Sequence, residues 1–269
     1  YDAYLSAIIQ LGGRPVAVPA MLTDGRFSWD PDRLETACSP RTRAMLVNSP
    51  WNPTGTVLRN DEWAGLMELA ERHNLYVISD EIYESICYPG HRHRTPAALS
   101  DDARSRTIIV NSLSKTYAMT GWRVGYCAAP PDVISAMYLV LQQSSRGPAT
   151  FVQDAAAAAL QGPQDCVVEM AAEYAIRREQ VLTALADVPA VDVLAPEGGF
   201  FAMADARGLR RPSDDIRRDL LVDHGVVVMH GGAYGESAEG TLRISFASGG
   251  DNLEQGLLRL AAGLQELGS

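Results

Sequence analysis

The sequence predicts an α/β fold with a mainly parallel sheet, followed by a smaller C-terminal α+β domain. Short apolar stretches alternate with helical patterns over the first part of the chain, which is typical of a parallel sheet covered by helices. After Pro189 the pattern changes to closely spaced strands with few helices. We therefore expect a large domain at residues 1–188 and a small domain at residues 189–269.

Four apolar stretches in the large domain predict strands. They lie at residues 44–48, 75–79, 107–110 and 125–128. Between the first two, Asn60 is a good helix N-cap, with acids in the following turn. Apolar residues then recur at helical spacing, namely Trp63, Leu66, Met67 and Ala70.

The remainder of the chain reads as a helical stretch followed by the small domain. Residues 131–188 are mostly helical, with breaks near Gly147-Pro148 and Gly162-Pro163. Strands are expected at residues 191–194, 200–204, 226–229 and 242–246, and a helix near 214–224. A last helix begins at Asp251, which with Glu254 resembles a capping box. Its buried stripe would be formed by Leu253, Leu257, Leu260, Leu264 and Leu267.

Composition excludes several classes of protein. The 269 residues carry a net charge of −10, whereas a nucleic-acid-binding protein needs a basic face. The four cysteines are scattered without paired spacing, which favours free thiols in a reducing cytoplasm, and no apolar run is long enough to span a membrane. The first residues lack a start methionine, so we expect the chain to begin inside a larger protein.

Lys115 is the only lysine in the chain, although Lys and Arg together number 23. A lysine amine can lose its proton and add to an aldehyde to give a Schiff base, whereas a guanidinium stays protonated. Chance survival of one surface lysine explains the observation about equally well, so the neighbouring residues decide. Ser112 and Arg123, with glycines between and after them, are suited to binding a phosphate. A Schiff-base lysine beside a phosphate site points to pyridoxal 5′-phosphate (PLP).

Three further residues meet the needs of that cofactor. Asp80, at the end of a predicted strand, can keep a pyridine nitrogen protonated, although it could instead be a helix N-cap. Tyr83 can donate to the ring oxygen O3′, as can the amide of Asn52, although Asn52 also suits a simple turn. The bonds Ser49-Pro50 and Asn52-Pro53 are candidates for the cis conformation.

Five segments together resemble the class I/II aminotransferases of PLP fold type I, in the order and at the spacing usual in that family. They are NSPWNPTG, SDEIY, NSLSKTYAMTGWRVGY, PEGGFF and LRISFAS. The third segment, with the lysine eight residues before the arginine, is the most specific, and it is most similar to bacterial aspartate and broad-specificity enzymes. The resemblance implies a three-layer large domain with a mainly parallel sheet, and the N-terminal part of that domain lies outside this sequence.

The resemblance also implies a role for each matching residue. Lys115 would bond the cofactor and later move a proton, and Asp80 would pair with the pyridinium nitrogen. Tyr83 and Asn52 would bond O3′, and Ser112 and Arg123 would bind the phosphate. Two residues are added to the set: Arg243 would clamp the substrate carboxylate together with Asn52, and Tyr1 would stack on the cofactor ring. No metal ligand is implied.

Several positions depart from the family pattern or stay open. His230-Gly231 stands where the family has proline and glycine, and we interpret His230 as a tolerated loop replacement. His91 and His93 could suggest a metal pair, but no acid or cysteine cluster accompanies them in the sequence, so we interpret both as an exposed loop. Arg146 could reach the substrate pocket, although a surface position is favoured.

The function that the resemblance implies is transfer of an amino group between an L-amino acid and a 2-oxo acid such as 2-oxoglutarate. The amino donor could be aspartate, an aromatic amino acid or a broad range. The alternatives are a PLP-dependent C–S lyase of the same fold and the PLP-sensing domain of a transcription regulator. The family also implies a cytoplasmic homodimer that binds neither nucleic acid nor membrane.

Overall fold

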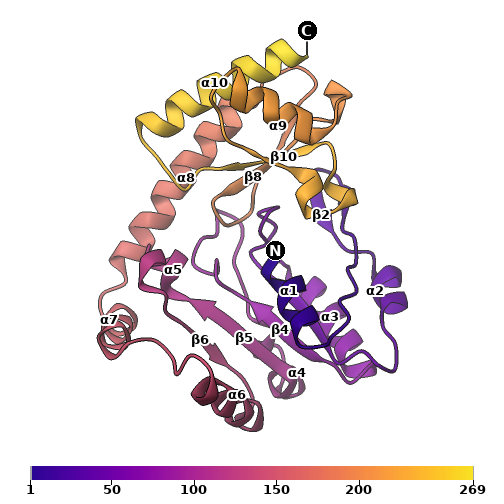
Figure 1. Cartoon of the computed structure of the whole chain (residues 1–269), viewed down its shortest axis with the longest axis vertical. Helices are drawn as coiled ribbons and strands as arrows, with labels where there is room; N and C mark the ends of the chain where they lie inside the picture. The colour runs from indigo at the N-terminus through magenta and orange to yellow at the C-terminus, as the bar shows by residue number, and fades with distance from the viewer. Residues whose placement is uncertain (1, 269) are drawn as a thin grey trace. The chain divides into compact units, whose positions relative to one another are not determined.

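The computed structural model describes residues 2–268, and the chain divides into two compact units (Figure 1). Unit 2 holds Cys38–Trp51 and Val57–Glu173, and unit 1 holds the other described residues, which are 2–37, 52–56 and 174–268. None of the helices between residues 2 and 268 is long and apolar enough to cross a membrane.

Unit 2 contains a four-stranded, mostly parallel sheet, as predicted. Its strands are β3 (Ala44–Asn48), β4 (Tyr76–Asp80), β5 (Thr107–Ser112) and β6 (Gly125–Ala128). The order is β3-β4-β5-β6, in which β3, β4 and β5 are parallel and β6 is antiparallel to β5. The four predicted strands are confirmed within two residues at each end.

The helices of unit 2 alternate with its strands as far as β6 and then follow one another along the chain. They are α3 (Asn60–Arg72), α4 (Asp101–Arg106), α5 (Leu113–Thr116), α6 (Pro131–Gln143), α7 (Thr150–Gln161) and the first part of α8 (Asp165–Leu185). The breaks near Gly147-Pro148 and Gly162-Pro163 are confirmed, because they separate α6, α7 and α8. Short 3₁₀ turns lie at Pro96–Ala98 and Thr120–Trp122.

Helix α3 shows how local sequence determines an element. Its apolar residues Trp63, Leu66, Met67 and Ala70 are buried as the spacing predicts. The predicted N-cap is wrong by one residue, because Asn60 is already helical and Arg59 precedes the helix. The carboxylate of Glu62 accepts a hydrogen bond from the Arg59 amide at 2.8 Å, so an acid inside the first turn performs the capping.

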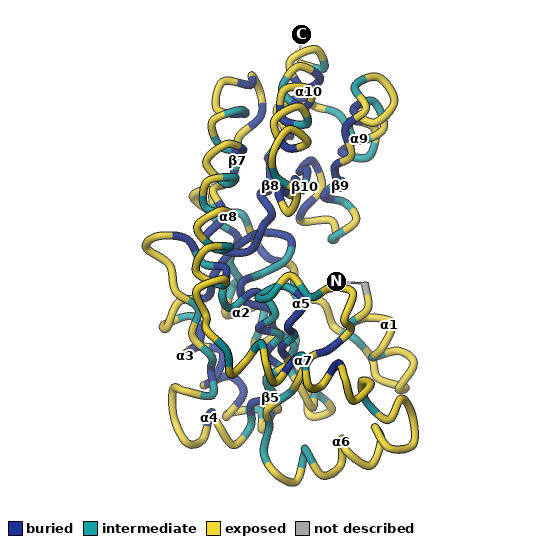
Figure 2. Tube along the Cα trace, turned by 90° about the vertical axis from the view of Figure 1, so that its left-hand side faces the viewer, coloured by how far each residue is buried: buried dark blue, intermediate teal, exposed yellow. Residues whose placement is uncertain are grey.

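Unit 1 is built around an antiparallel sheet of order β7-β8-β10-β9. Its strands are β7 (Asp192–Leu194), β8 (Phe201–Asp205), β9 (Met229–His230) and β10 (Thr241–Ser245), and β8 and β10 are mostly buried (Figure 2). The strand predicted at residues 226–229 is wrong for its first three residues. Val226 and Val228 are buried and Val227 is exposed, so this segment has the alternation of a strand without the ladder hydrogen bonds.

The other elements of unit 1 come from both ends of the chain. They are α1 (Asp2–Gln10), β1 (Met21–Thr23), β2 (Arg26–Ser28), α2 (Pro31–Ala37), α9 (Ser213–Val222), α10 (Asp251–Leu267) and 3₁₀ turns at Arg207–Leu209, Gly231–Tyr234 and Glu236–Ala238. In α10 the predicted leucines Leu253, Leu257, Leu260 and Leu264 are buried, and Leu267 is half-buried. The predicted Asp251–Glu254 capping box is wrong, because Gly250 precedes the helix and its carbonyl accepts from the amides of Leu253 and Glu254.

The division into units differs from the expected domain boundary at residue 188. The second half of α8 belongs with unit 1, where Arg177 donates to the Ala247 carbonyl at 2.7 Å and Arg178 to the Pro196 carbonyl at 2.8 Å. Residues 2–37 also belong to unit 1, and Arg26 pairs there with Glu197 at 2.8 Å. These contacts join segments far apart in the chain, which composition and periodicity do not show.

Candidate functional site

Three of the predicted site residues lie at one edge of the sheet in unit 2. Asp80 is the last residue of β4, and its register partner on the neighbouring parallel strand β5 is Val110. Ser112 ends β5 two residues later, and Lys115 follows in α5. Because parallel strands end at the same edge, the chain places a carboxylate, a hydroxyl and an amine where open α/β sheets bind their ligands.

Lys115 is partly withdrawn from water. Burial lowers the pKa of its amine below the ordinary value of 10.5, and the positive charge of Arg123 lowers it further. A lowered pKa increases the fraction of neutral amine, which is the nucleophilic form. This environment differs from that of a solvated surface lysine.

Ser112 and Arg123 are held by local hydrogen bonds. The Ser112 hydroxyl accepts from the Ser114 amide at 3.1 Å and lies 3.0 Å from the Val124 carbonyl, to which it can donate. Arg123 has a left-handed backbone (φ 52°), follows the 3₁₀ turn at Thr120–Trp122, and donates to the Thr120 carbonyl at 3.1 Å. The guanidinium is exposed, so most of its donors can reach an anion.

Asp80 and Tyr83 lie on the turn that leaves β4. One carboxylate oxygen of Asp80 accepts from the Ile82 amide at 3.2 Å, which is an Asx turn, and the segment that follows is not an α-helix. The N-cap interpretation of Asp80 therefore does not apply. Tyr83 is buried, with 6% of its surface exposed.

The donor set of unit 2 fits a phosphorylated pyridine aldehyde such as PLP. An amine with a lowered pKa can bond the aldehyde, a carboxylate can pair with the ring nitrogen, and a guanidinium and hydroxyl can bind phosphate. PLP also needs hydrogen-bond donors to its ring oxygen. That Tyr83 and Asn52 supply them stays a prediction.

Arg243 and Asn52 form a contact within unit 1 that spans 191 residues of sequence. Arg243 lies in the middle of β10, and its Nη1 donates to the Asn52 Oδ1 at 3.1 Å. The guanidinium carbon lies 5.2 Å from the ring centre of Phe201 and 5.6 Å from that of Tyr234. The Arg243 Nε is buried and has no hydrogen-bond partner among residues 2–268. A preorganised guanidinium with a buried donor to spare is suited to binding a carboxylate.

Sequence reasoning missed the aromatic residues that flank Arg243. Phe201 belongs to the PEGGFF segment and pairs in register with Ser245 on β10, two residues from Arg243. Alternate residues of antiparallel neighbours lie on one face, so this contact could have been predicted once the two strands were paired. Tyr234 lies in a 3₁₀ turn and carried no such signal.

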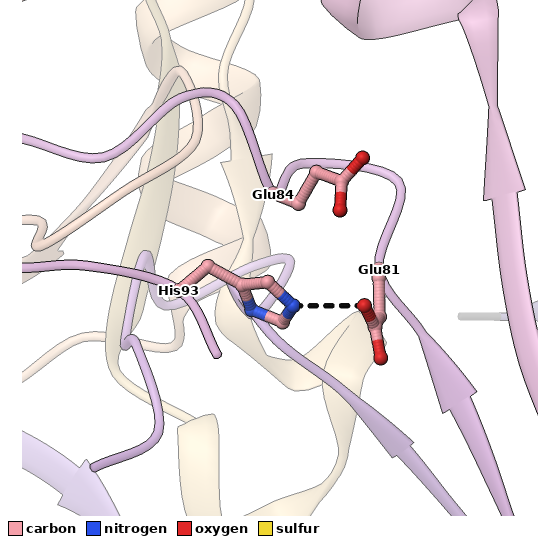
Figure 3. Close-up of side chains that lie close together, drawn as sticks. All are labelled: Glu81, Glu84 and His93. Atoms are coloured by element: carbon pink, nitrogen blue, oxygen red, sulfur yellow. Dashed lines mark hydrogen bonds and ion pairs between the residues drawn. The ribbon is translucent and has the colours of Figure 1, made fainter. Parts of the chain in front are cut away.

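The structure corrects the interpretation of His93. His91 is exposed as expected, but the His93 side chain is only 6% exposed, and its Nε2 lies 2.9 Å from the Glu81 carboxylate (Figure 3). Glu84 completes a cluster whose possible ligand atoms all lie within 4.8 Å of one another. The acids that the sequence analysis found lacking are Glu81 and Glu84, which the fold brings to His93 from the end of β4.

The remaining predicted positions lie as follows. Arg146 is exposed, as favoured, with a left-handed backbone (φ 59°) between α6 and α7. His230 lies on β9, and its Nε2 is 3.9 Å from the Asp214 carboxylate. Tyr1 lies outside the described residues. Both X–Pro bonds singled out, Ser49-Pro50 and Asn52-Pro53, are cis.

Comparison with known proteins identifies the relatives of the chain. Residues 1–259 match the family model for aminotransferase class I and II. The chain is 36% identical to an aspartate aminotransferase of Pyrococcus abyssi and 38% identical to an arginine–pyruvate transaminase of Pseudomonas aeruginosa, each match covering 99% of this chain. The crystal structure of an aromatic aminotransferase from Pyrococcus horikoshii superposes with a TM-score of 0.94 at 37% identity, over 99% of this chain and 71% of that one. The chain spans 68% and 67% of the first two relatives, about two thirds of their length.

Proposed function

This chain belongs to the class I and II aminotransferases, a family of transaminases, and we propose that it exchanges an amino group between an L-amino acid and a 2-oxo acid with PLP as its cofactor. The observation that carries the proposal is the environment of Lys115. The single lysine of the chain lies at the edge of the sheet near Asp80 and Ser112, with a pKa lowered by burial and by Arg123.

When bound, PLP supplies an aldehyde that captures an amino group and a protonated ring that stabilises negative charge at the neighbouring carbon. Lys115 would hold the cofactor through its amine and, once released by the amino acid, would take the proton from the substrate Cα. The carboxylate of Asp80 would keep the ring nitrogen protonated. Ser112 and Arg123 would hold the phosphate, and Tyr83 and Asn52 would donate to the ring oxygen.

Arg243 and Asn52 are proposed to bind the substrate carboxylate. Asn52 and the rings of Phe201 and Tyr234 fix the guanidinium, which lowers the entropy lost when a carboxylate binds. The buried Nε would gain a hydrogen bond that it lacks among the described residues. This contact recognises the end common to all amino acids and 2-oxo acids.

The relatives indicate that the amino donor is an amino acid, but they do not agree on which one. Their names include aspartate, aromatic-amino-acid and arginine–pyruvate aminotransferases, which differ in the side chain of the donor. We propose 2-oxoglutarate as one acceptor and aspartate, an aromatic amino acid or a broader set as donor. We further propose a homodimer located in the cytoplasm, as the family resemblance implies.

The test of the proposal is capture of PLP by Lys115. The purified protein is expected to develop a new absorption band on addition of PLP, borohydride should remove it by reducing the imine, and mass spectrometry should locate the adduct at Lys115. Lys115→Ala and Lys115→Arg should show no adduct. Capture by either variant, or an adduct elsewhere, would contradict the proposal.

A second assay separates transamination from the lyase reaction. Incubation with an amino donor and 2-oxoglutarate should yield glutamate, whereas a C–S lyase would release ammonia and pyruvate from a cysteine conjugate. Arg243→Lys, which replaces the planar fork by a point charge, should raise KM for donor and acceptor alike while PLP capture is unchanged. Arg210→Lys, an exposed position in the same unit, is the matched control.

A further inference from the structure

Glu81 and Glu84, in the turn after β4, form a polar cluster with His93 from a later loop of unit 2 (Figure 3). Glu81 is almost fully buried, with 2% of its surface exposed, and its carboxylate is occupied on both sides. One oxygen accepts from the Ser79 hydroxyl at 2.9 Å and the other lies 2.9 Å from the His93 Nε2. Because a carboxylate can only accept, the Nε2 of His93 is the donor in this pair.

The cluster has the composition of a metal site, but its hydrogen bonding argues against one. A histidine that binds a metal normally donates its second ring N–H to a carboxylate or carbonyl. The Nδ1 of His93 is buried and has no such partner among the described residues. An ion held between His93 and Glu81 would have to take the place of the Nε2 proton and so break that hydrogen bond.

Glu84 instead connects the cluster to Ser112 at the end of β5, the residue proposed to bind the phosphate. Its carboxylate accepts from the Asn111 side-chain amide at 2.6 Å, and the Asn111 oxygen accepts from the Ser112 amide at 2.7 Å. A carboxylate can only accept and a backbone N–H can only donate, so the two contacts determine which way the Asn111 amide points. Asn111 is buried, with 5% of its surface exposed, which leaves it few other partners.

Glu81 anchors the turn that carries Glu84. The Glu81 carbonyl accepts from the Glu84 amide at 2.9 Å, and the Glu81 amide donates to the Val110 carbonyl on β5 at 2.9 Å. The hydrogen bond to His93 holds the side chain of Glu81, and the two backbone hydrogen bonds hold its main chain. The pKa of Glu84 is raised above its ordinary value, and burial is the largest cause. The hydrogen bond from Asn111 lowers it, the charge of Glu81 raises it, and the charge of His93 lowers it.

We propose that Glu84 is a positioning residue for the phosphate end of the cofactor, acting through Asn111 on the backbone of Ser112. This role rests on the proposed function, because the phosphate is that of PLP. Glu84 would touch neither cofactor nor substrate. It would hold the backbone of Ser112 in place through Asn111, so that the Ser112 hydroxyl stays within reach of the phosphate.

The test compares PLP with pyridoxal, which lacks the phosphate. Glu84→Ala should weaken PLP binding about tenfold, the effect of losing one hydrogen bond to a charged group, and leave pyridoxal binding within about twofold. Glu84→Gln, which keeps an acceptor for Asn111, should restore most of the affinity for PLP. Glu68→Ala, an exposed glutamate on α3, is the control and should change neither.

Hydrogen exchange gives a readout that needs no cofactor. The Ser112 amide should exchange faster in Glu84→Ala than in the wild type and in Glu84→Gln. The wild type could fail to capture either aldehyde while exchange of the Ser112 amide still responds to substitution of Glu84. That result would overturn the proposed function and the phosphate role of Glu84. The hydrogen-bonded link from Glu84 through Asn111 to Ser112 would stand. Equal losses for PLP and pyridoxal, or unchanged Ser112 exchange, would overturn the positioning role alone. So would one equivalent of zinc bound by the wild type and lost in Glu84→Ala.

Discussion

At the scale of a single residue, two separate effects act on the amine of Lys115. Burial disfavours the charged amine, and the nearby guanidinium of Arg123 repels it, so both lower the pKa. Under the proposed function Arg123 would have two tasks, because the charge that favours a neutral amine would also attract the phosphate of PLP. An arginine at position 115 could not respond in this way, since its guanidinium stays protonated.

The pH dependence of aldehyde capture should report this environment. Because the pKa of Lys115 is lowered, the rate of pyridoxal capture should rise with pH around a midpoint below 10.5. Arg123→Gln removes the repelling charge, so the midpoint should move upward while burial keeps it below the ordinary value. Stopped-flow absorbance measures both. Arg146→Gln, an exposed arginine of the same unit, should leave the midpoint unchanged, and a shift in that variant would point to a general charge effect.

At the scale of one element, Glu239 serves as a cap for α9 from outside the helix. Its two carboxylate oxygens accept from the Ser213 amide at 2.8 Å and from the Ser213 hydroxyl at 2.9 Å. The bond from the Ser213 amide is the main cause of the lowered pKa of Glu239, and bonds from the Ser213 hydroxyl and the Gly240 amide and the charge of His230 add to it. A negative charge at a helix N-terminus is stabilising.

Glu239→Gln should destabilise the protein by about 0.5–1 kcal/mol near neutral pH, a modest effect because the site is exposed. The folded-state pKa lies below the ordinary 4.5, so this stability is fully present above about pH 4.5 and is lost as the pH falls through the folded value. Urea unfolding of wild type and variant should therefore converge in acid. Glu236→Gln, on the neighbouring turn, is the control, and a constant difference at all pH values would contradict the charge explanation.

Gly55 shows how a loop depends on one glycine. Its backbone is left-handed (φ 72°), its carbonyl accepts from the amides of Glu197 and Gly198, and an added Cβ would lie 2.4 Å from the Pro196 Cβ. Strain and overlap therefore act together at this position.

Gly55→Ala should lower the free energy of unfolding by about 2–4 kcal/mol, as expected where both backbone and packing oppose a side chain. Gly65→Ala is the matched control. Gly65 lies inside α3 with no atom within 4 Å of an added Cβ, so alanine there should stabilise by about 0.5–1 kcal/mol. Urea unfolding measures both, and equal effects of the two substitutions would refute the structural argument.

At the scale of the whole molecule, helix α6 exposes apolar side chains that no other described part of the chain covers. None of its residues, all of them described, is buried, and Leu139 and Val140 are 65% and 69% exposed. Exposed apolar side chains on neighbouring positions of one helix mark an interaction surface. A second copy of the chain, as in the proposed homodimer, would cover them.

Light scattering should give a mass of about twice the 29.1 kDa of the chain. Val140→Asp would place a charge in the interface and should shift the mass toward the monomer. Val168→Asp on α8, equally exposed at 69%, should leave the dimer intact. A monomer in the wild type, or dissociation by both substitutions alike, would contradict the assignment of α6 to the interface.

The sequence by itself determined the family, the fold class and the chemical candidates. Strands and helices follow from periodicities read over a few residues, and motifs such as NSLSKTYAMTGWRVGY are local, so neither requires knowledge of distant contacts. The lone lysine stood out because arginine cannot replace it chemically. Errors arose at caps and at the strand predicted from residue 226, where neighbouring amides and ladder partners decide.

Only the tertiary structure decided which residues far apart in the chain meet. It divided the chain so that residues 2–37 and 52–56 join the C-terminal unit, and it joined Arg243 to Asn52 across 191 positions. It also buried His93 against Glu81 in a segment interpreted as an exposed loop. Pairings of this kind depend on how strands and turns are arranged in space, and a one-dimensional pattern carries no record of that arrangement.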